Sequence, residues 1–199
     1  ALGVLYRCPA TRSEIAAAAA RIWPARFDPE GAPLYPGLDS VLTKTEVEKR
    51  LAIGKPYALR LDMKRALSLV RERAGPRLTF IEKAADDRKT ERVCHPERWG
   101  DVVLARKEMP ASYHLCVVVD DARQGVTHVT RGMDLYAATD VHRVLQVLLD
   151  LPSPLYHHHR LILAPDGRKL SKTAGDTSLR SLRAAGWTAA DVRRRLSLV

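Results

Sequence analysis

The chain has 199 residues, a length that allows one large domain or two small ones with a real hydrophobic core. Hydrophobic residues make up 46% and charged residues 28%, as in soluble globular proteins, and no apolar run approaches the ~18 residues of a transmembrane helix, so we expect no membrane role. The net charge of +10 favours a polyanionic partner such as nucleic acid, although a basic surface without a specific role explains the charge equally well.

The cysteine content predicts a reducing compartment. Cys8, Cys94 and Cys116 are odd in number and widely spaced, which argues against a disulfide framework. The N-terminal segment has no basic lead and too short an apolar run for a signal peptide. We therefore expect a cytoplasmic protein.

Two helices are predicted in the first ~55 residues, which otherwise consist of turns. Both segments, 11–22 (TRSEIAAAAARI) and 43–54 (TKTEVEKRLAIG), begin with a Thr that a Glu follows three residues later, the spacing of a capping box. Between them, residues 31–40 (GAPLYPGLDS) contain two Gly and two Pro and are expected to form a loop. The capping pairs are Thr11 with Glu14 and Thr43 with Glu46, and Gly54 ends the second helix.

Two strands are predicted after the second helix. Residues 55–63 (KPYALRLDM) alternate Tyr57, Leu59 and Leu61 with smaller or polar side chains, as a half-buried strand does. Residues 77–83 (RLTFIEK) indicate another short strand.

The sequence becomes β-rich at about Gly100. Three segments are predicted strands: 100–107 (GDVVLARK), 113–121 (YHLCVVVDD) and 126–132 (VTHVTRG). The run 116–119 is apolar on both faces, which is typical of a central strand in a covered sheet.

Helices and strands alternate in the rest of the chain. Helical spacing of apolar residues over 139–151 (TDVHRVLQVLLDL) predicts a helix that Thr139 or Asp140 caps. Residues 159–167 (HRLILAPDG) indicate a strand that ends in an Asp-Gly turn, and two short helices follow at 178–186 and 188–199. The alternation predicts an open α/β sheet.

A pair of lysines follows the last predicted strand. Lys169 and Lys172 lie in the segment 166–176 (DGRKLSKTAGD), and ligands of open α/β sheets bind beyond the carboxyl ends of strands. Two lysines on such a loop can neutralise the phosphates of a nucleotide, whereas the alternative is a solvated surface turn. The sequence contains neither G-x-x-x-x-G-K-[ST] nor G-x-G-x-x-G, so P-loop and dinucleotide chemistry are not indicated.

Arg131 and Tyr113 are candidate ligand-binding residues. Arg131 stands at the end of a predicted strand, where a guanidinium can hold a carboxylate in a bidentate fork. Tyr113 stands at the start of the preceding apolar strand, from which its hydroxyl can add one hydrogen bond. The alternatives are an ordinary rim Arg and an amphipathic Tyr.

The three histidines at 157–159 suggest a metal site at first sight. Adjacent residues of a strand point to opposite faces, so at most two of the three can share an ion, and no cysteine or carboxylate lies at ligand spacing nearby. We therefore favour a structural role for this run.

Three segments together resemble one family. SYHLCVVVDD (112–121), GVTHVTRGMDLYAATDVHRVLQVLL (125–149) and HHHRLILAPDGRKLSK (157–172) are similar in order and spacing to the second half of the catalytic domain of class I glutamyl-tRNA synthetases. The resemblance implies a Rossmann-like α/β fold and assigns Tyr113 and Arg131 to glutamate. It further implies that Lys172 is the principal catalytic lysine of an ATP-binding segment that also contains Lys169, Leu170 and Ser171.

The first half of the chain resembles the insertion of a short paralogue. LYRCPATRSEI (5–15) and APLYPGLDS (32–40) are similar to the glutamyl-queuosine tRNA(Asp) synthetases. The resemblance divides the chain into an α+β insertion subdomain, residues 1–99, and the C-terminal half of the catalytic domain, residues 100–199. It implies that glutamate is activated by ATP with Mg²⁺, without tRNA, and is then transferred to the queuosine base of tRNA(Asp).

Two departures from the family pattern are expected to matter. Cys8 and Tyr35 match two of the family's zinc positions, but Ala10 and Asp39 occupy the other two, so we expect no zinc. The family's H-x-G-H motif is absent, and the start of the chain resembles a point well inside the family's sequence. We therefore expect a fragment without the first half of the nucleotide-binding fold, inactive by itself and monomeric.

Two other functions fit the same residues. One is a truncated glutamyl-tRNA synthetase that charges tRNA(Glu), which would need tRNA before it activates glutamate. The other is a non-catalytic RNA-binding module, which the basic charge and the missing ATP motif favour.

Overall fold

The computed structural model describes residues 2–164, 166–168, 170 and 177–196. These residues form two compact units. The larger comprises Ala1–Arg131 and Leu135–His158, and the smaller comprises Gly132–Asp134 and His159–Val199. The division of the chain into residues 1–99 and 100–199 remains a prediction.

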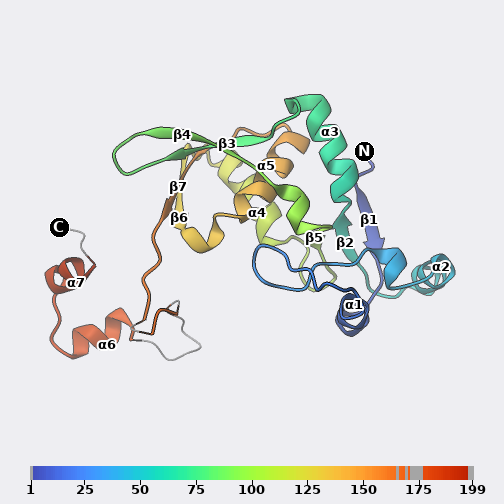
Figure 1. Ribbon diagram of the computed structural model, residues 1–199, viewed down its shortest axis with the longest axis horizontal. Helices are drawn as coiled ribbons and strands as arrows, with labels where there is room; N and C mark the ends of the chain where they lie inside the picture. The colour runs from blue at the N-terminus through green and yellow to red at the C-terminus, as the bar shows by residue number, and fades with distance from the viewer. Residues whose placement is uncertain (1, 165, 169, 171–176, 197–199) are drawn as a thin grey trace. The chain divides into compact units, whose positions relative to one another are not determined.

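The larger unit contains two sheets, shown in Figure 1. Strands β1 (Leu5–Cys8), β2 (Ala58–Leu61) and β5 (Val103–Ala105) form an antiparallel sheet in the order β1-β2-β5. The second sheet has the order β4-β3-β7-β6, and its strands are β3 (Thr79–Lys83), β4 (Lys89–Val93), β6 (His128–Gly132) and β7 (Leu155–His159).

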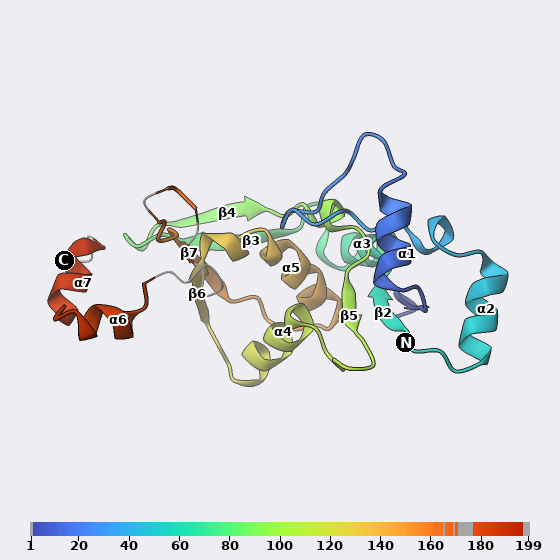
Figure 2. The same ribbon diagram turned by 90° about the horizontal axis from the view of Figure 1, so that it is seen from below.

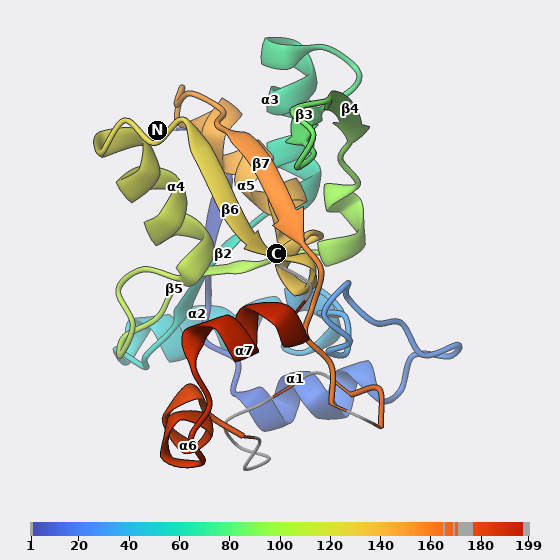
Figure 3. The same ribbon diagram turned by 90° about the vertical axis from the view of Figure 1, so that its left-hand side faces the viewer.

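The second sheet mixes two directions. β3 and β4 form an antiparallel hairpin, whereas β3 pairs with β7 in parallel with Glu82 opposite Tyr156. Figure 3 shows β6 and β7 side by side and pointing the same way. Parallel pairing needs a crossover connection, which helix α5 supplies between β6 and β7, and the predicted α/β class is confirmed.

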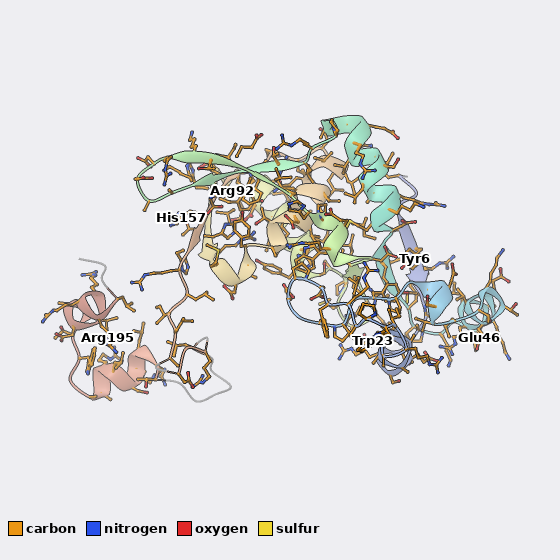
Figure 4. All side chains as sticks on the ribbon, in the orientation of Figure 1. Tyr6, Trp23, Glu46, Arg92, His157 and Arg195 are labelled. Atoms are coloured by element: carbon orange, nitrogen blue, oxygen red, sulfur yellow. The ribbon has the colours of Figure 1, made fainter. Side chains whose placement is uncertain are left out.

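Local capping explains where the first helices begin. In α1 (Arg12–Ala19) and α2 (Lys44–Ala52) both predicted capping boxes are present, with Thr11 and Thr43 as the N-caps. The loop predicted between them is confirmed, except for the 3₁₀ turn η1 (Leu38–Ser40). Figure 4 shows Trp23 in the segment between α1 and this loop.

Three elements of the larger unit, β1, α3 and β4, were not predicted from the sequence. The expectation that the first ~55 residues contain only helices and turns is wrong at β1, which pairs with β2 along its whole length. Helix α3 (Met63–Ala74) was not predicted, although Asp62 caps it and Gly75, with a φ of 86°, ends it. β4 was also missed because its side chains are mostly polar and exposed.

The strand predicted over 113–121 is wrong, because the structure has helix α4 (Tyr113–Arg123) there. The Ser112 hydroxyl accepts a hydrogen bond from the Leu115 backbone N–H and starts the helix. An apolar run does not by itself distinguish a buried strand from a helix, and packing against α5 overrides the β propensity of the three valines. Figure 2 shows α4 next to α5.

Helix α5 (Ala138–Leu148) forms the centre of the core. Val141 and Val144 are completely buried, and the Phe80 ring packs edge-on against the Tyr156 ring in the same core. The helix was predicted, but its cap was not: Ala137 is the N-cap and already has helical dihedrals because the 3₁₀ turn η3 (Met133–Leu135) leads into it. Thr139 and Asp140 are therefore buried in the first turn instead of capping it.

The last strand lies earlier than predicted. β7 ends at His159, the first residue of the predicted range 159–167, so the strand prediction is wrong for residues 160–164. The predicted turn is present, because the Gly167 N–H donates to the Ala164 carbonyl and Gly167 has a φ of 82°. Helices α6 (Leu179–Ala184) and α7 (Ala189–Arg195) are confirmed. The 3₁₀ turn η2 (Pro96–Trp99), which precedes β5, was not predicted.

Candidate functional site

Arg131 is held by three acceptors within the larger unit. It lies in β6, one residue before the strand ends. Its Nε donates to Nε2 of His158 at 3.1 Å, one terminal nitrogen donates to Nδ1 of His142 at 3.0 Å, and the other donates to the Thr139 hydroxyl at 2.6 Å. His158 lies in β7, and Thr139 and His142 lie in α5. The guanidinium is therefore fixed by the two elements that follow β6 in the larger unit.

The tautomers of the two histidines follow from these contacts. An arginine only donates, so Nε2 of His158 and Nδ1 of His142 must be unprotonated acceptors. The proton of His158 is therefore on Nδ1 and is donated to Oε2 of Glu82 at 2.8 Å. The proton of His142 is on Nε2 and is donated to Nδ1 of His114 at 3.2 Å.

Both histidines that contact Arg131 are kept neutral. Burial, followed by the Arg131 cation, lowers the pKa of His142 to about 2. Burial also lowers the pKa of His158, and its hydrogen bond to Glu82 opposes that shift only in part, so this contact is not an ion pair at neutral pH. Burial lowers the pKa of the next histidine, His114, to about 4.

Arg131 forms no ion pair within the described part of the chain, although its charge partly opposes the burial that raises the pKa of Asp121. Its direct partners are two neutral imidazoles and a hydroxyl, and the Tyr156 ring lies 5.2 Å from the guanidinium carbon. The three contacts use three of the five N–H groups, which leaves one on each terminal nitrogen. Two N–H groups on two nitrogens are what a carboxylate accepts in a bidentate pair.

Tyr113 lies beside the same cluster. It is the first residue of α4 and not the start of a strand as predicted, and its side chain is 46% exposed. The Tyr113 ring lies 5.7 Å from the ring of His142 and 5.7 Å from that of His114. The structure thus brings Tyr113 and Arg131 to one site, with the His142 imidazole contacting both.

The residues predicted for nucleotide binding are only partly described. Leu170 is partly exposed, whereas Lys169, Ser171 and Lys172 lie outside the residues that the structure describes. Their assignment remains a prediction from the resemblance.

Cys8 and Tyr35, the two residues that match the family's zinc positions, contact each other. Sγ of the buried Cys8 lies 3.5 Å from the Tyr35 hydroxyl, and the Arg60 guanidinium carbon lies 3.6 Å from the centroid of the Tyr35 ring. No group of three potential metal-ligating side chains occurs among the described residues. A thiol and a phenol do not satisfy tetrahedral zinc, which takes four ligands, so the residues present do not fit this metal.

Asp101 forms hydrogen bonds with three elements of the larger unit. Its carboxylate accepts from the Tyr6 hydroxyl at 2.7 Å and from the Met63 backbone N–H at 2.9 Å, and its carbonyl accepts from Arg60 at 2.6 Å. β1, β2 and the start of α3 are therefore linked by one residue that the sequence did not single out. Figure 4 shows Tyr6 on β1.

The histidine run has protein partners. Nδ1 of His157 lies 2.8 Å from the Lys83 carbonyl, and His158 contacts Glu82 and Arg131. The structural role favoured for the run fits His157, but His158 also belongs to the Arg131 site, as do His142, Thr139 and Glu82. Their only signal in the sequence is a polar residue within an otherwise apolar segment.

The chain matches a family model described as tRNA synthetases class I (E and Q), catalytic domain, over residues 3–196. It is 41% identical to a Rhodobacter capsulatus protein named glutamyl-Q tRNA(Asp) synthetase, with 98% of this chain and 68% of that protein covered. It is 36% identical to a protein of the same name from Symbiobacterium thermophilum, with 92% and 52% covered. A Synechococcus sp. (strain CC9902) protein named glutamate–tRNA ligase is 34% identical, with 99% and 39% covered.

A solved structure is similar in fold. The crystal structure of glutamate-tRNA synthetase from Elizabethkingia anophelis superposes with a TM-score of 0.59 at 23% identity, covering 87% of this chain and 33% of that one. The chain therefore spans about half to two thirds of the glutamyl-Q relatives and a third of this structure. None of the described helices is long and apolar enough to cross a membrane.

Proposed function

This chain belongs to the family of class I tRNA synthetases for glutamate and glutamine, and from that premise we propose that it activates glutamate with ATP and transfers it to the queuosine base of tRNA(Asp). The relatives named glutamyl-Q tRNA(Asp) synthetase support this acceptor. Their similarity extends over 98% and 92% of this chain.

The Arg131 site is the observation that carries the proposal. A cation held only by neutral groups retains its full charge for a ligand, and the two remaining N–H groups suit a carboxylate of glutamate. The Tyr113 ring lies 5.7 Å from the His142 ring, which itself contacts Arg131, and we assign the Tyr113 hydroxyl to the same ligand. We assign the two N–H groups to the γ-carboxylate, since the α-carboxylate is common to all amino acids and is the group that reacts with ATP. A neutral or cationic side chain would then leave the Arg131 charge unmatched, which favours glutamate as the substrate.

The reaction has two steps. A carboxylate oxygen of glutamate attacks the α-phosphorus of ATP and the bond to pyrophosphate breaks, which yields glutamyl-adenylate; the acceptor on the tRNA then attacks the acyl carbon and AMP leaves. We assign Lys172 to the charge that develops on the phosphorus centre in the first step, with Lys169, Leu170 and Ser171 in the same segment.

The proposed substrates also indicate the conditions of the reaction. ATP enters as its Mg²⁺ complex, so this metal is part of the substrate and not of the protein. We assign no step to zinc. We propose that the protein acts in the cytoplasm, where ATP and tRNA are available, and that it acts as a monomer.

A second function is favoured by one observation. Relatives named glutamate–tRNA ligase cover 99% of the chain at 34% identity, which supports charging of tRNA(Glu) as the alternative. The two functions differ in whether glutamate is activated before tRNA binds.

Glutamate-dependent ATP–pyrophosphate exchange by the full-length protein tests the proposal. We expect exchange in the absence of tRNA, followed by glutamylation of tRNA(Asp) that contains queuosine but not of tRNA(Asp) that lacks it. Exchange that requires tRNA(Glu) would support the alternative, whereas salt-sensitive tRNA binding without any exchange would support a non-catalytic RNA-binding module.

A further inference from the structure

His142 is a buried imidazole on a helix face that is otherwise mainly apolar. Its side chain is 2% exposed, and the neighbouring Val141 and Val144 are completely buried. A polar side chain in such a place costs free energy unless its hydrogen bonds are satisfied. Both ring nitrogens of His142 are satisfied, one by Arg131 and the other by His114.

The two hydrogen bonds give the ring a fixed orientation. Because Arg131 can only donate, Nδ1 of His142 accepts and Nε2 donates to His114. The guanidinium is planar, so fixing one terminal nitrogen at His142 and Nε at His158 sets the plane in which the two free N–H groups lie. The direction of those N–H groups decides how well a carboxylate is bound.

We propose that His142 is a positioning residue for Arg131, and that its neutral Nδ1 sets the orientation of the guanidinium and thereby the affinity for glutamate. The inference rests on the proposed function, since it assumes that Arg131 binds the carboxylate of glutamate. Neither the resemblance nor the names of the relatives assign a role to this histidine.

Protonation of His142 would defeat this role, because it would replace the acceptor by a donor and place two cations 3.0 Å apart. The groups around His142 oppose protonation. The groups that face it are Tyr113 and His114 of α4, Arg131 of β6 and His158 of β7. Two further cations on elements packed against α5 have other partners. Arg98 of η2 pairs with Asp140 at 3.9 Å, and Arg73 of α3 donates to carbonyls of the last turn of α5.

Two substitutions separate positioning from packing. His142→Phe fills the ring volume without an acceptor, whereas His142→Asn places a carbonyl oxygen on the same carbon that carries Nδ1. In the full-length protein we expect His142→Phe to raise the KM for glutamate by about ten-fold or more, as expected for a lost hydrogen bond to a charged group, with the KM for ATP changed less than about two-fold. His142→Asn should stay within about three-fold of the wild type.

The two variants are expected to rank in the opposite order by Tm to their order by glutamate affinity. Phe suits the apolar surroundings and Asn is smaller, so the Tm of His142→Asn should be the lower of the two. A purely structural role predicts the same order for Tm and for glutamate affinity. His128→Phe, at an exposed position of β6, is the matched control and should change neither quantity.

The protonation state has its own measurement. ¹⁵N–¹H spectra of the histidine rings should show His142 protonated at Nε2 alone from pH 8 to about 5.5, and over that range the ratio of the wild-type KM for glutamate to that of His142→Asn should stay constant. A doubly protonated His142 near pH 6.5, or an Nδ1-protonated tautomer, would overturn the inference. So would equal glutamate KM values for wild type and His142→Phe.

Failure of the proposed function would look different. A wild-type protein without glutamate-dependent exchange would overturn the function and, with it, the role of His142 in glutamate affinity. An active wild type with an unaffected His142→Phe variant would overturn the inference alone.

Discussion

Oε2 of Glu82 accepts a hydrogen bond of 2.8 Å from Nδ1 of His158, which joins strands β3 and β7 through side chains as well as backbone. The same carboxylate also accepts from the His158 backbone N–H at 2.8 Å through Oε1. Both carboxylate oxygens are therefore acceptors for one residue, and this pairing orients the imidazole that holds Arg131.

Replacing Glu82 by Gln should break one of the two contacts, because a carboxamide offers one acceptor oxygen and its NH₂ group then faces a second donor of His158. We expect Glu82→Gln to lower the free energy of unfolding by about 1–3 kcal/mol, which urea unfolding measures. Glu48→Gln, on the exposed face of α2, is the control and should be neutral. Equal stability of the two variants would show that the Glu82 pairing contributes little.

Replacing Arg131 tests the carboxylate site. Lys keeps the charge but cannot serve three fixed acceptors and a ligand, so Arg131→Lys should raise the KM for glutamate by about 100-fold while the KM for ATP stays nearly unchanged. The measurement is pyrophosphate exchange by the full-length protein. A fully active Arg131→Lys variant would contradict bidentate binding.

Lys172 is expected to act on the transition state and not on glutamate binding. Lys172→Ala should lower the rate of pyrophosphate exchange by about 10²–10³-fold with a much smaller effect on the KM for glutamate. Lys44→Ala, at an exposed position of α2, provides the control. Equal activity of Lys172→Ala and wild type would remove Lys172 from the mechanism.

The contact of Cys8 with Tyr35 should be independent of metal. Tyr35→Phe loses the hydroxyl contact and should cost about 0.5–1.5 kcal/mol, whereas Tyr35→Ala also loses the packing of Arg60 on the ring and should cost about 2–3 kcal/mol. Incubation with EDTA should leave the Tm unchanged to within about 1 °C. A drop in Tm that added zinc reverses would show that the site holds a metal after all.

Acid should weaken the fold before the carboxylates titrate. His114 and His142 have pKa values of about 4 and about 2 in the folded chain, against an ordinary value of 6.5, so below pH 6.5 the unfolded chain binds protons that the folded chain does not. The free energy of unfolding should therefore fall as the pH drops from 6.5 toward 4.5, by up to ~1.4 kcal/mol per pH unit for each histidine. In His142→Phe the free energy of unfolding should fall less steeply as the pH drops, by up to ~1.4 kcal/mol per pH unit, because one histidine is removed. Urea unfolding at several pH values measures this slope.

Local signals in the sequence predicted much of the fold. The capping pairs at Thr11 and Thr43 fix two helices through contacts within four residues, so they appear in the sequence as they do in the structure. The segment 113–121 was wrongly predicted as a strand because its three valines favour a strand by propensity, and only the packing on α5 makes it a helix.

Local sequence signals also predicted part of the candidate site. Arg131 and Tyr113 were found as single residues with suitable chemistry at the ends of elements. His142 and His158 were not, because 16 residues separate them along the chain and only the pairing of β7 with β3 and the crossover of α5 bring both to one guanidinium. Such contacts depend on the order of the strands and on the crossover helix, and the sequence pattern within one segment does not show either.

The two sheets also constrain how this chain can be rearranged by recombination. The first sheet takes β1 and β2 from before residue 99 and β5 from after it, and the second takes β3 and β4 from before and β6 and β7 from after. A chimera joined at that point would have to rebuild a strand interface in each sheet with a foreign partner. Exchange of the first 99 residues between distant relatives should therefore be selected against, and the two halves should be inherited together.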